Sequence, residues 1–234
     1  MAATQHTSLW KERLTAPAYL VAEAARYART TQQTIGNWQK IRGGRRAVSH
    51  RDTGEALSYL QLIEVGVVAA MRKSGVKLRR IREAREYLQK EFENEFPFAH
   101  YRFKTDGKEL FMDYDQIVAS DKEKLLALNE NGQLAWNEIL SGLLQEFEYD
   151  TEVGTVLRWK VGGLDSPIRL DPRVAFGAPS VDGIPTWVLR ERWKSGESLA
   201  DIAADYDLAH DFVSAALRFE LIEIDPDRPN TWIN

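Results

Sequence analysis

The chain has 234 residues, of which 44% are hydrophobic and 28% charged, an ordinary composition for a globular protein with room for two modest domains. No apolar run approaches the length of a membrane-spanning helix, and the absence of cysteine excludes disulfides, thiolate zinc sites and thiol catalysis. The first residues lack the basic and then apolar pattern of a secretory signal, so we expect a cytoplasmic protein.

The formal net charge of −4 conceals a difference between two parts of the chain. Residues 1–100 carry 17 Lys and Arg against 10 Asp and Glu, a charge of +7, whereas the remaining residues carry 14 against 25, a charge of −11. Because the first part attracts a polyanion and the second repels it, we expect nucleic acid to bind the N-terminal part only.

Residues 19–41 show the pattern of two short helices joined by a tight turn. Small and apolar residues recur at helical spacing in residues 21–28, and the spacing resumes after Thr31. The Thr31 hydroxyl suits the N-cap of the second helix, where it can accept a hydrogen bond from an unpaired backbone N–H. The residues predicted to lie on the buried faces are Val21, Ala24, Ala25, Ala28, Ile35, Trp38 and Ile41.

The outer face of the second helix is polar, and the basic, glycine-broken segment "RGGRR" follows it. Such side chains can bind base edges and phosphates, as in a recognition helix flanked by a short hairpin or wing. The alternative is a solvated helix end followed by a basic loop. We predict DNA binding, with contacts from Thr31, Gln32, Gln33, Asn37, Lys40, Arg42, Arg45, Arg46 and Arg51.

Two longer helices are predicted after the basic segment, over about residues 58–73 and 77–95, with a Ser-Gly break between them. The order of parts, from the helix pair through the arginine-rich segment to "MRKSGVKLRRIREAREYL", resembles the DNA-binding domain of MerR-type transcription regulators. The resemblance implies a winged helix-turn-helix fold that binds double-stranded operator DNA as a homodimer.

Residues 98–170 change from helical to alternating periodicity. Asp106-Gly107 predicts a two-residue hairpin, a helix is expected near residues 133–145, and "FEYDTEVGTVLRWKVG" predicts a second small hairpin. No chemical motif falls here, so we interpret this region as a mixed connector or docking surface.

The last part of the chain repeats the two-helix pattern. Ser198 and Asp201 have the spacing of a capping box, and Pro185 and Gly196 suit the start and end of a preceding helix. The outer face is acidic, so we expect contact with protein rather than DNA. Its acidic residues are Asp201, Asp205, Asp207 and Asp211, opposed by His210 and Arg218.

Residues 168–220 resemble the small C-terminal domain of unknown function found in many type II antitoxins. Together with the MerR-like first part, the whole chain resembles VapB-type antitoxins of the two-domain kind. The resemblance implies a cognate toxin with a PIN-like ribonuclease fold, which the protein neutralises, and repression of the shared operon. The pattern that carries it is Asp171-Pro172, Gly177–Pro179, Gly183–Thr186 and Gly196–Ser198.

The C-terminal tail is a second candidate surface for the toxin. An arginine on a proline-punctuated segment could pair with the catalytic carboxylates of a nuclease, whereas the alternative is a frayed terminus. The expected toxin contacts are Arg218, Arg228 and Trp232.

An enzyme is not expected. The four histidines are scattered without metal-ligand spacing, and no phosphate-binding loop or nucleophile motif occurs. We therefore predict no catalytic residue, no metal and no cofactor.

The predicted fold is mainly α with small β-hairpins. It comprises a winged helix-turn-helix domain over residues 1–97, a β-hairpin and helix connector over 98–170, and a three-helix domain with tail over 171–234. Two alternatives to the antitoxin remain: a stand-alone MerR-like regulator whose C-terminal domain senses a ligand or a protein, and a phage or plasmid accessory protein.

Overall fold

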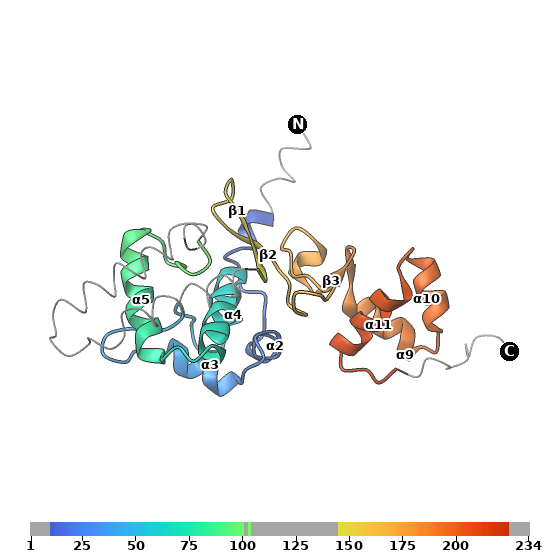
Figure 1. The fold of residues 1–234 in the computed structure, drawn as a ribbon, viewed down its shortest axis with the longest axis horizontal. Helices are drawn as coiled ribbons and strands as arrows, with labels where there is room; N and C mark the ends of the chain where they lie inside the picture. The colour runs from blue at the N-terminus through green and yellow to red at the C-terminus, as the bar shows by residue number, and fades with distance from the viewer. Residues whose placement is uncertain (1–9, 101–102, 104–144, 225–234) are drawn as a thin grey trace. The chain divides into compact units, whose positions relative to one another are not determined.

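A computed structural model describes residues 10–100, 103 and 145–224 (Figure 1). These residues are mainly helical with two small strand pairs, as the sequence predicts. The chain divides into two compact units, residues 1–157 and 158–234. The hairpin predicted at Asp106-Gly107 lies outside the described residues, and so does the helix expected near 133–145, apart from its last residue.

The first unit begins with the predicted pair of short helices, α2 (Val21–Tyr27) and α3 (Gln32–Gln39). Arg29 takes the left-handed conformation between them, with φ of 51°. The Thr31 hydroxyl accepts a hydrogen bond from the backbone N–H of Thr34 at 3.1 Å, which confirms the predicted N-cap.

The two short helices bury most of the residues expected on their inner faces. Ile35 and Trp38 of α3 are buried, as are Ala24 and Ala25 of α2 and Ala28 after it, whereas Val21 is half-buried. Ile41, however, is 56% exposed, so its predicted burial is wrong. The reason is that α3 ends at Gln39 and Lys40 has extended backbone, so helical spacing does not continue to residue 41.

A tight hairpin follows α3 and is named here the arginine hairpin (Arg42–Arg45). The backbone N–H of Arg42 donates to the carbonyl of Arg45 at 2.9 Å, and the reverse bond is 3.2 Å. Gly43 and Gly44 at the turn have φ of 57° and 79°. A two-residue turn with two positive φ values matches the twist of paired strands and favours glycine at both positions.

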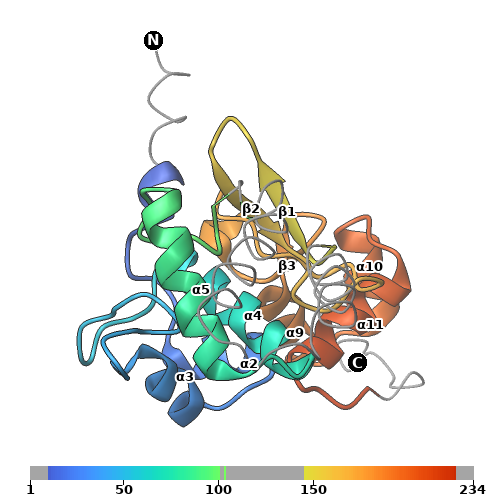
Figure 2. The same ribbon diagram turned by 60° about the vertical axis from the view of Figure 1, so that its left-hand side comes forward.

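Two longer helices complete the helical part of the first unit: α4 (Tyr59–Lys73) and α5 (Leu78–Glu91). Ser58 and Gln61 form a capping box at the start of α4, most of which is buried. Helix α5 lies beside α4, and the loop with the arginine hairpin lies beside α5 in both ribbon views (Figure 2). Helix α5 ends at Glu91, earlier than predicted, because Glu93 takes a left-handed conformation, with φ of 48°.

The second predicted small hairpin is present. It pairs β1 (Phe147–Asp150) with β2 (Thr155–Trp159), and β2 crosses the boundary between the units. The Asp150 carboxylate accepts bonds from two backbone N–H groups of the turn, each at 2.9 Å. The Thr155 hydroxyl donates to the carbonyl of Ala99 at 2.7 Å, which ties the hairpin to the chain after α5.

The second unit places a small strand pair before three helices. A 3-10 turn, η1 (Ala175–Gly177), leads to β3 (Ser180–Val181) and β4 (Ile184–Pro185), which pair antiparallel. The helices are α9 (Thr186–Lys194), α10 (Leu199–Asp205) and α11 (His210–Phe219). They pack around a core that includes Leu189, Trp193, Ile202, Val213 and Leu217.

The helix limits of the second unit follow the predicted signals. Pro185 is the N-cap residue of α9, and Gly196 lies just past its end with φ of 105°. Ser198 caps α10 by accepting from the backbone N–H of Asp201 at 3.2 Å. The Ser198 hydroxyl in turn donates a bond to the Asp201 carboxylate.

Candidate nucleic-acid interface

The polar residues predicted to bind DNA on α3 are exposed. Gln32 and Gln33 lie in the first turn, and Asn37 lies near the end of the helix. Lys40 follows the last turn, and its Nζ donates to Oδ1 of Asn37 at 3.3 Å. Thr31 is also exposed, although its hydroxyl is engaged in capping. Helix α3 therefore presents a neutral, hydrogen-bonding surface with a cation at one end.

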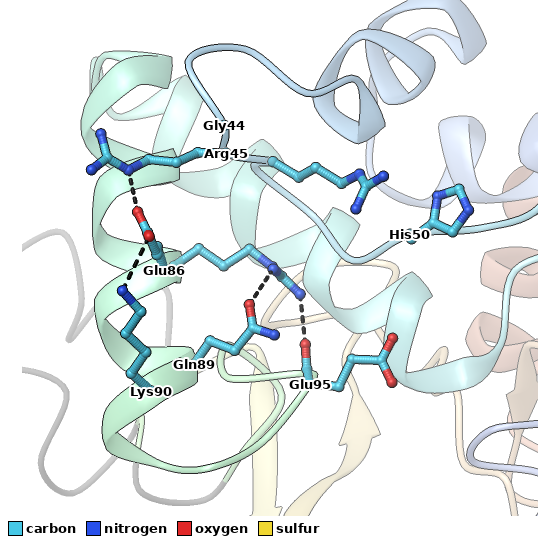
Figure 3. Close-up of a pocket in the computed structure, with 9 residues that line it drawn as sticks. Gly44, Arg45, His50, Glu86, Gln89, Lys90 and Glu95 are labelled. Atoms are coloured by element: carbon cyan, nitrogen blue, oxygen red, sulfur yellow. Dashed lines mark hydrogen bonds and ion pairs between the residues drawn. The ribbon is translucent and has the colours of Figure 1, made fainter.

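In the arginine hairpin, Arg42 and Arg45 are exposed. Nε of Arg45 forms an ion pair with the carboxylate of Glu86 on α5. Nζ of Lys90 lies 3.2 Å from the other oxygen of the same carboxylate (Figure 3). The hydrogen bond from Arg45 lowers the pKa of Glu86, and Lys90 adds to this effect. Glu86 thus partly neutralises the cation that was predicted to contact a phosphate.

The other two predicted arginines are half-buried and bind backbone carbonyls. Nε of Arg46 donates to the carbonyl of Gln39 at 3.0 Å. Nη1 of Arg51 donates to the carbonyls of Asp52, at 3.2 Å, and of Glu55. Both side chains hold loops in place, and only their remaining N–H groups are left for a phosphate.

Tertiary contacts satisfy the last carbonyls of α3. The carbonyl of Asn37 accepts from Nη2 of Arg82 on α5 at 3.3 Å. The next carbonyl, of Trp38, accepts from the backbone N–H of Ala47 at 2.9 Å, and that of Gln39 accepts from Arg46. Since a helix leaves its last carbonyls unpaired, these bonds fix the end of α3 to the following loop and to α5.

A buried ion pair that was not predicted from the sequence lies behind this surface. Nε of Arg85 on α5 lies 3.2 Å from Oε1 of Glu64 on α4, and both side chains are buried. The backbone N–H of Ser49 donates to Oε2 of Glu64 at 2.7 Å. Arg85 also donates to Gln89, at 3.1 Å, and to the carbonyl of Glu95, at 2.6 Å.

The network joins the loop after the arginine hairpin to α4, α5 and the chain beyond α5. Burial raises the pKa of Glu64, while the charge of Arg85 and the bond from Ser49 lower it. One sequence signal could have indicated the pair, because Glu64 is the sole charged residue within the apolar run "YLQLIEVGVVAAM". A carboxylate in such a run requires a buried partner.

A pocket of about 510 Å³ lies between the arginine hairpin and α5. In Figure 3, Arg45, Glu86 and Lys90 lie along one side and His50 lies across from them. The lining is polar and carries both signs of charge, which suits a polar or charged molecule better than an apolar one. The lining residues are Gly44, Arg45, Arg46, His50, Arg85, Glu86, Gln89, Lys90 and Glu95.

Within the described parts of the chain, no group of three or more His, Asp or Glu side chains could hold a metal ion. In those same parts, no helix combines the length and the apolarity needed to cross a bilayer.

In the second unit, the acidic residues predicted on the surface are partly paired. Asp205 is exposed, and its carboxylate lies 2.5 Å from Nη2 of Arg192. The same guanidinium pairs with Glu197 and lies 5.2 Å from the ring centre of Tyr206. Of the other predicted acidic residues, Asp201 is half-buried, whereas Asp207 and Asp211 are exposed.

Of the three expected toxin contacts, the structure describes Arg218 only. It lies in the last turn of α11 and is exposed. Arg228 and Trp232 lie outside the described residues.

Residues of the pattern that resembles the antitoxin C-terminal domain have structural roles in the second unit. The buried carboxylate of Asp171 binds two arginines, Arg173 at 2.6 Å and Arg158 at 3.1 Å. The buried Thr186 hydroxyl donates to Glu220 at 2.5 Å, which joins the start of α9 to the end of α11. Gly183 has φ of 87° in the turn between β3 and β4. These residues organise the fold of the unit.

Comparison with known proteins places the chain among related sequences. A family model described as "Protein of unknown function (DUF433)" matches residues 168–219. The chain is also 26% identical over 227 residues to a Mycobacterium tuberculosis protein named "Putative antitoxin VapB45", covering 88% of this chain and 94% of that protein. The chain is therefore antitoxin-like in sequence.

A crystal structure of Rv2018 from Mycobacterium tuberculosis has a similar fold. The TM-score is 0.69 at 23% sequence identity, and the match covers 88% of this chain and 99% of that one. This likeness concerns the fold. The relative in the sequence comparison is named as an antitoxin and not as an enzyme.

Proposed function

We propose that this protein is the antitoxin of a type II toxin–antitoxin system. It neutralises a PIN-like ribonuclease toxin by direct binding, and it represses its own operon by binding operator DNA. The observation that carries the proposal is the similarity to a protein named as an antitoxin along almost the full length of both chains. An antitoxin of this kind acts by binding, without catalysis, metal or cofactor.

The proposed DNA-binding surface consists of α3 and the arginine hairpin, within a MerR-like domain over residues 1–97. Gln33 and Asn37 are exposed on α3, as base-reading side chains need to be. Arg42 and Arg45 are exposed next to it and supply cations for phosphates. The excess of 17 basic over 10 acidic residues in this part of the chain supports the same location. The protein binds its operator as a homodimer.

The proposed toxin-binding surface lies in the C-terminal domain, over residues 171–234, with residues 98–170 as a connector. Exposed carboxylates at Asp207 and Asp211 disfavour a phosphate backbone there. Trp187 of α9 is half exposed, and aromatic side chains of this kind are common at the centres of protein interfaces. Arg218 is the proposed contact on α11.

The test is co-expression of the full chain with the product of the adjacent gene. The expected results are that the neighbour alone stops growth, that both proteins together permit growth, and that the two co-purify. A neighbour that is harmless without this protein, together with no co-purification, would refute the antitoxin proposal.

A second candidate is a stand-alone MerR-like regulator that senses a ligand. The pocket of about 510 Å³ beside the arginine hairpin favours it, because a polar ligand there would contact Arg45 and so act on the proposed DNA surface. The discriminating measurement is the thermal unfolding of the purified chain with a panel of polar metabolites. A clear rise in Tm with one metabolite and no protein partner in pull-downs would favour this candidate.

A further inference from the structure

The pocket between the arginine hairpin and α5 has an unusually polar lining. Its volume of about 510 Å³ is that of a small-molecule site, for which about 300–1,000 Å³ is typical. Such sites are mostly lined by hydrophobic and aromatic side chains, which hold the apolar parts of a ligand. Among the described residues that line this pocket, none is hydrophobic and His50 alone carries a ring. The pocket therefore suits a small polar molecule without a large aromatic group.

The pocket also carries an excess of positive charge. The guanidinium of Arg85 is balanced by Glu64, which is buried behind the pocket. In contrast, the single carboxylate of Glu86 is shared between Arg45 and Lys90. Four lining cations against two lining carboxylates and Glu64 leave one net positive charge, so the pocket attracts an anion. The charged lining residues are Arg45, Arg46, Arg85, Lys90, Glu86 and Glu95.

Several N–H groups of the lining are left for such an anion. Nε of Arg46 donates to the carbonyl of Gln39 at 3.0 Å, and within the described residues no carboxylate pairs with this guanidinium. Oε1 of Gln89 accepts from Arg85 at 3.1 Å, which leaves the amide NH₂ of Gln89 as a donor. A guanidinium fork matches the oxygens of a phosphate group, so Arg46 is the lining residue best suited to bind one.

Glu95 gives the same pocket an acceptor. Its backbone carbonyl accepts from Nη2 of Arg85 at 2.6 Å, which holds the residue at the pocket, and its side chain is exposed. In Figure 3 the Glu95 carboxylate points away from Glu86 and Lys90. A carboxylate accepts bonds from hydroxyl groups and repels a phosphate. A ligand with a phosphate at one end and hydroxyl groups at the other satisfies both kinds of residue.

We propose that this pocket binds a small sugar phosphate, with its phosphate group at Arg46 and its hydroxyl groups at Glu95, and that the bound ligand weakens DNA binding. A phosphate monoester carries a charge of about −1.5 to −2 at neutral pH. Next to Arg45 of the arginine hairpin, this charge repels the phosphates of DNA. The inference names the ligand class of the second candidate function. Its regulatory part rests on the proposed DNA binding, whereas binding of the sugar phosphate does not.

The test consists of two independent measurements on the full chain. The first is isothermal titration calorimetry without DNA, with ribose 5-phosphate and glucose 6-phosphate as probes. Ribose and inorganic phosphate are the comparison compounds, because each carries only one part of the proposed ligand. The second is binding to a fluorescent mixed-sequence duplex with and without the sugar phosphate, at constant ionic strength because DNA binding depends on salt.

At least one of the two sugar phosphates should bind more tightly than ribose and than inorganic phosphate. Arg46→Gln should weaken this binding about tenfold, as expected for the loss of a hydrogen bond between charged groups. Glu95→Ala changes an exposed side chain and should reduce the preference for the sugar phosphate over inorganic phosphate. Lys73→Gln is the matched control, because Lys73 is an exposed cation at the end of α4 outside the pocket lining, and it should bind as the wild type does.

A saturating sugar phosphate should weaken duplex binding of the wild type at least about fivefold, the lower end of typical coupling between two sites. It should have no such effect on Arg46→Gln. The Tm of each variant is measured in parallel, so that a loss of folding is not mistaken for a loss of binding. If Arg46→Gln fails to fold, Glu95→Ala still tests the site through the preference between the two phosphates.

The results that overturn the inference are distinguishable from a failure of DNA binding. If neither sugar phosphate binds, or if inorganic phosphate binds as tightly, the proposed ligand class is wrong. If a folded Arg46→Gln binds the sugar phosphate as the wild type does, the ligand is not in this pocket. If the sugar phosphate binds without weakening duplex binding, the regulatory part is wrong. If the wild type binds the sugar phosphate and not the duplex, the proposed DNA binding is wrong and the pocket assignment stands.

Discussion

Arg85 and Glu64 form an ion pair whose side chains are 7% and 0% exposed, with Nε and Oε1 3.2 Å apart. The pair joins α5 to α4, and Glu64 also holds the backbone of Ser49 in the loop after the arginine hairpin. Because each buried charge depends on the other, the arrangement of the proposed DNA surface depends on this pair.

Replacing Arg85 with Met should destabilise the first unit by about 3–5 kcal/mol, because it leaves the Glu64 carboxylate buried without a countercharge. Burial raises the pKa of Glu64 above its ordinary 4.5, so the ionised form is the costly one. The loss of unfolding free energy in Arg85→Met, relative to the wild type, should therefore be smallest below pH 4.5 and increase as the pH rises towards neutrality. Urea unfolding across this pH range measures it.

The control for this prediction is the double variant Glu64→Gln with Arg85→Met. It removes both charges and should be more stable than Arg85→Met alone at neutral pH. Equal stability of the two variants would show that the loss comes from packing and from the bonds of Arg85 to Gln89 and Glu95.

Replacing Glu86 with Gln should strengthen DNA binding. Glu86 pairs with Arg45, so removal of its charge releases a cation for a phosphate. Exposed ion pairs contribute roughly 0.2–1 kcal/mol, so the expected gain in affinity is at most about fivefold. Fluorescence anisotropy with a labelled duplex measures it.

Glu93→Gln is the control, because Glu93 is exposed on the chain after α5. A gain of the same size in both variants would mean that the effect is one of net charge alone.

Arg45 and Gln33 should differ in how they affect DNA binding. Replacing the exposed Arg45 with Ala removes a phosphate contact, so it should weaken binding to all sequences and reduce the salt slope by roughly one unit. Gln33→Ala should alter sequence preference and leave the slope nearly unchanged. Selection from a randomised duplex pool, with titrations at several salt concentrations, tests both. If both variants bind DNA as the wild type does, α3 and the arginine hairpin are not part of the interface.

Replacing Asp171 with Asn should destabilise the second unit at neutral pH by about 1.5–3 kcal/mol, the usual range for hydrogen bonds to charged groups. Although burial raises the pKa of Asp171, its bonds with Arg173 and Arg158 lower it to below 3.8 overall. A carboxyl group whose pKa is lower in the folded state than in the unfolded state stabilises the fold at a pH above its unfolded-state pKa. This stabilisation is lost as the pH falls through its folded-state pKa. The difference in stability between Asp171→Asn and the wild type should therefore decrease below pH 3.8.

Thermal unfolding of the wild type and of Asp171→Asn as a function of pH measures this effect. Asp165→Asn is the matched control, because Asp165 is exposed nearby in the sequence. It should change the Tm little at any pH. A constant deficit of Asp171→Asn down to strongly acidic pH would show that the charge of Asp171 is not what stabilises the unit.

The C-terminal contacts with the toxin can be separated by two variants, Arg218→Ala and a deletion of residues 225–234. If Arg228 and Trp232 of the tail inhibit the nuclease, the deletion should abolish inhibition while co-purification through the C-terminal domain persists. If Arg218 of α11 is part of the docking surface, its replacement should weaken co-purification. Unchanged inhibition in an RNA-cleavage assay with the deleted chain would exclude the tail from the mechanism.

Local signals in the sequence were sufficient for most of the secondary structure of the described residues. The Thr31 hydroxyl bonds to a backbone N–H three residues away, and Gly43-Gly44 adopts the two positive φ values that a tight hairpin needs. Such effects act between residues that are close in the chain. The end of α5 and the exposure of Ile41 were missed because nothing nearby marks where those helices stop.

The sequence by itself determined the helix pairs, their caps, the hairpin turns and the separation of basic from acidic charge. Only the tertiary structure decided which arginines are available to a phosphate. Arg45 pairs with a carboxylate 41 residues away, Arg85 with one 21 residues away, and Arg82 binds a carbonyl 45 residues away. These partners meet because the helices of the first unit pack together, α3 on α2, α2 on α4 and α4 on α5. The charge of a residue does not reveal which partner that packing supplies.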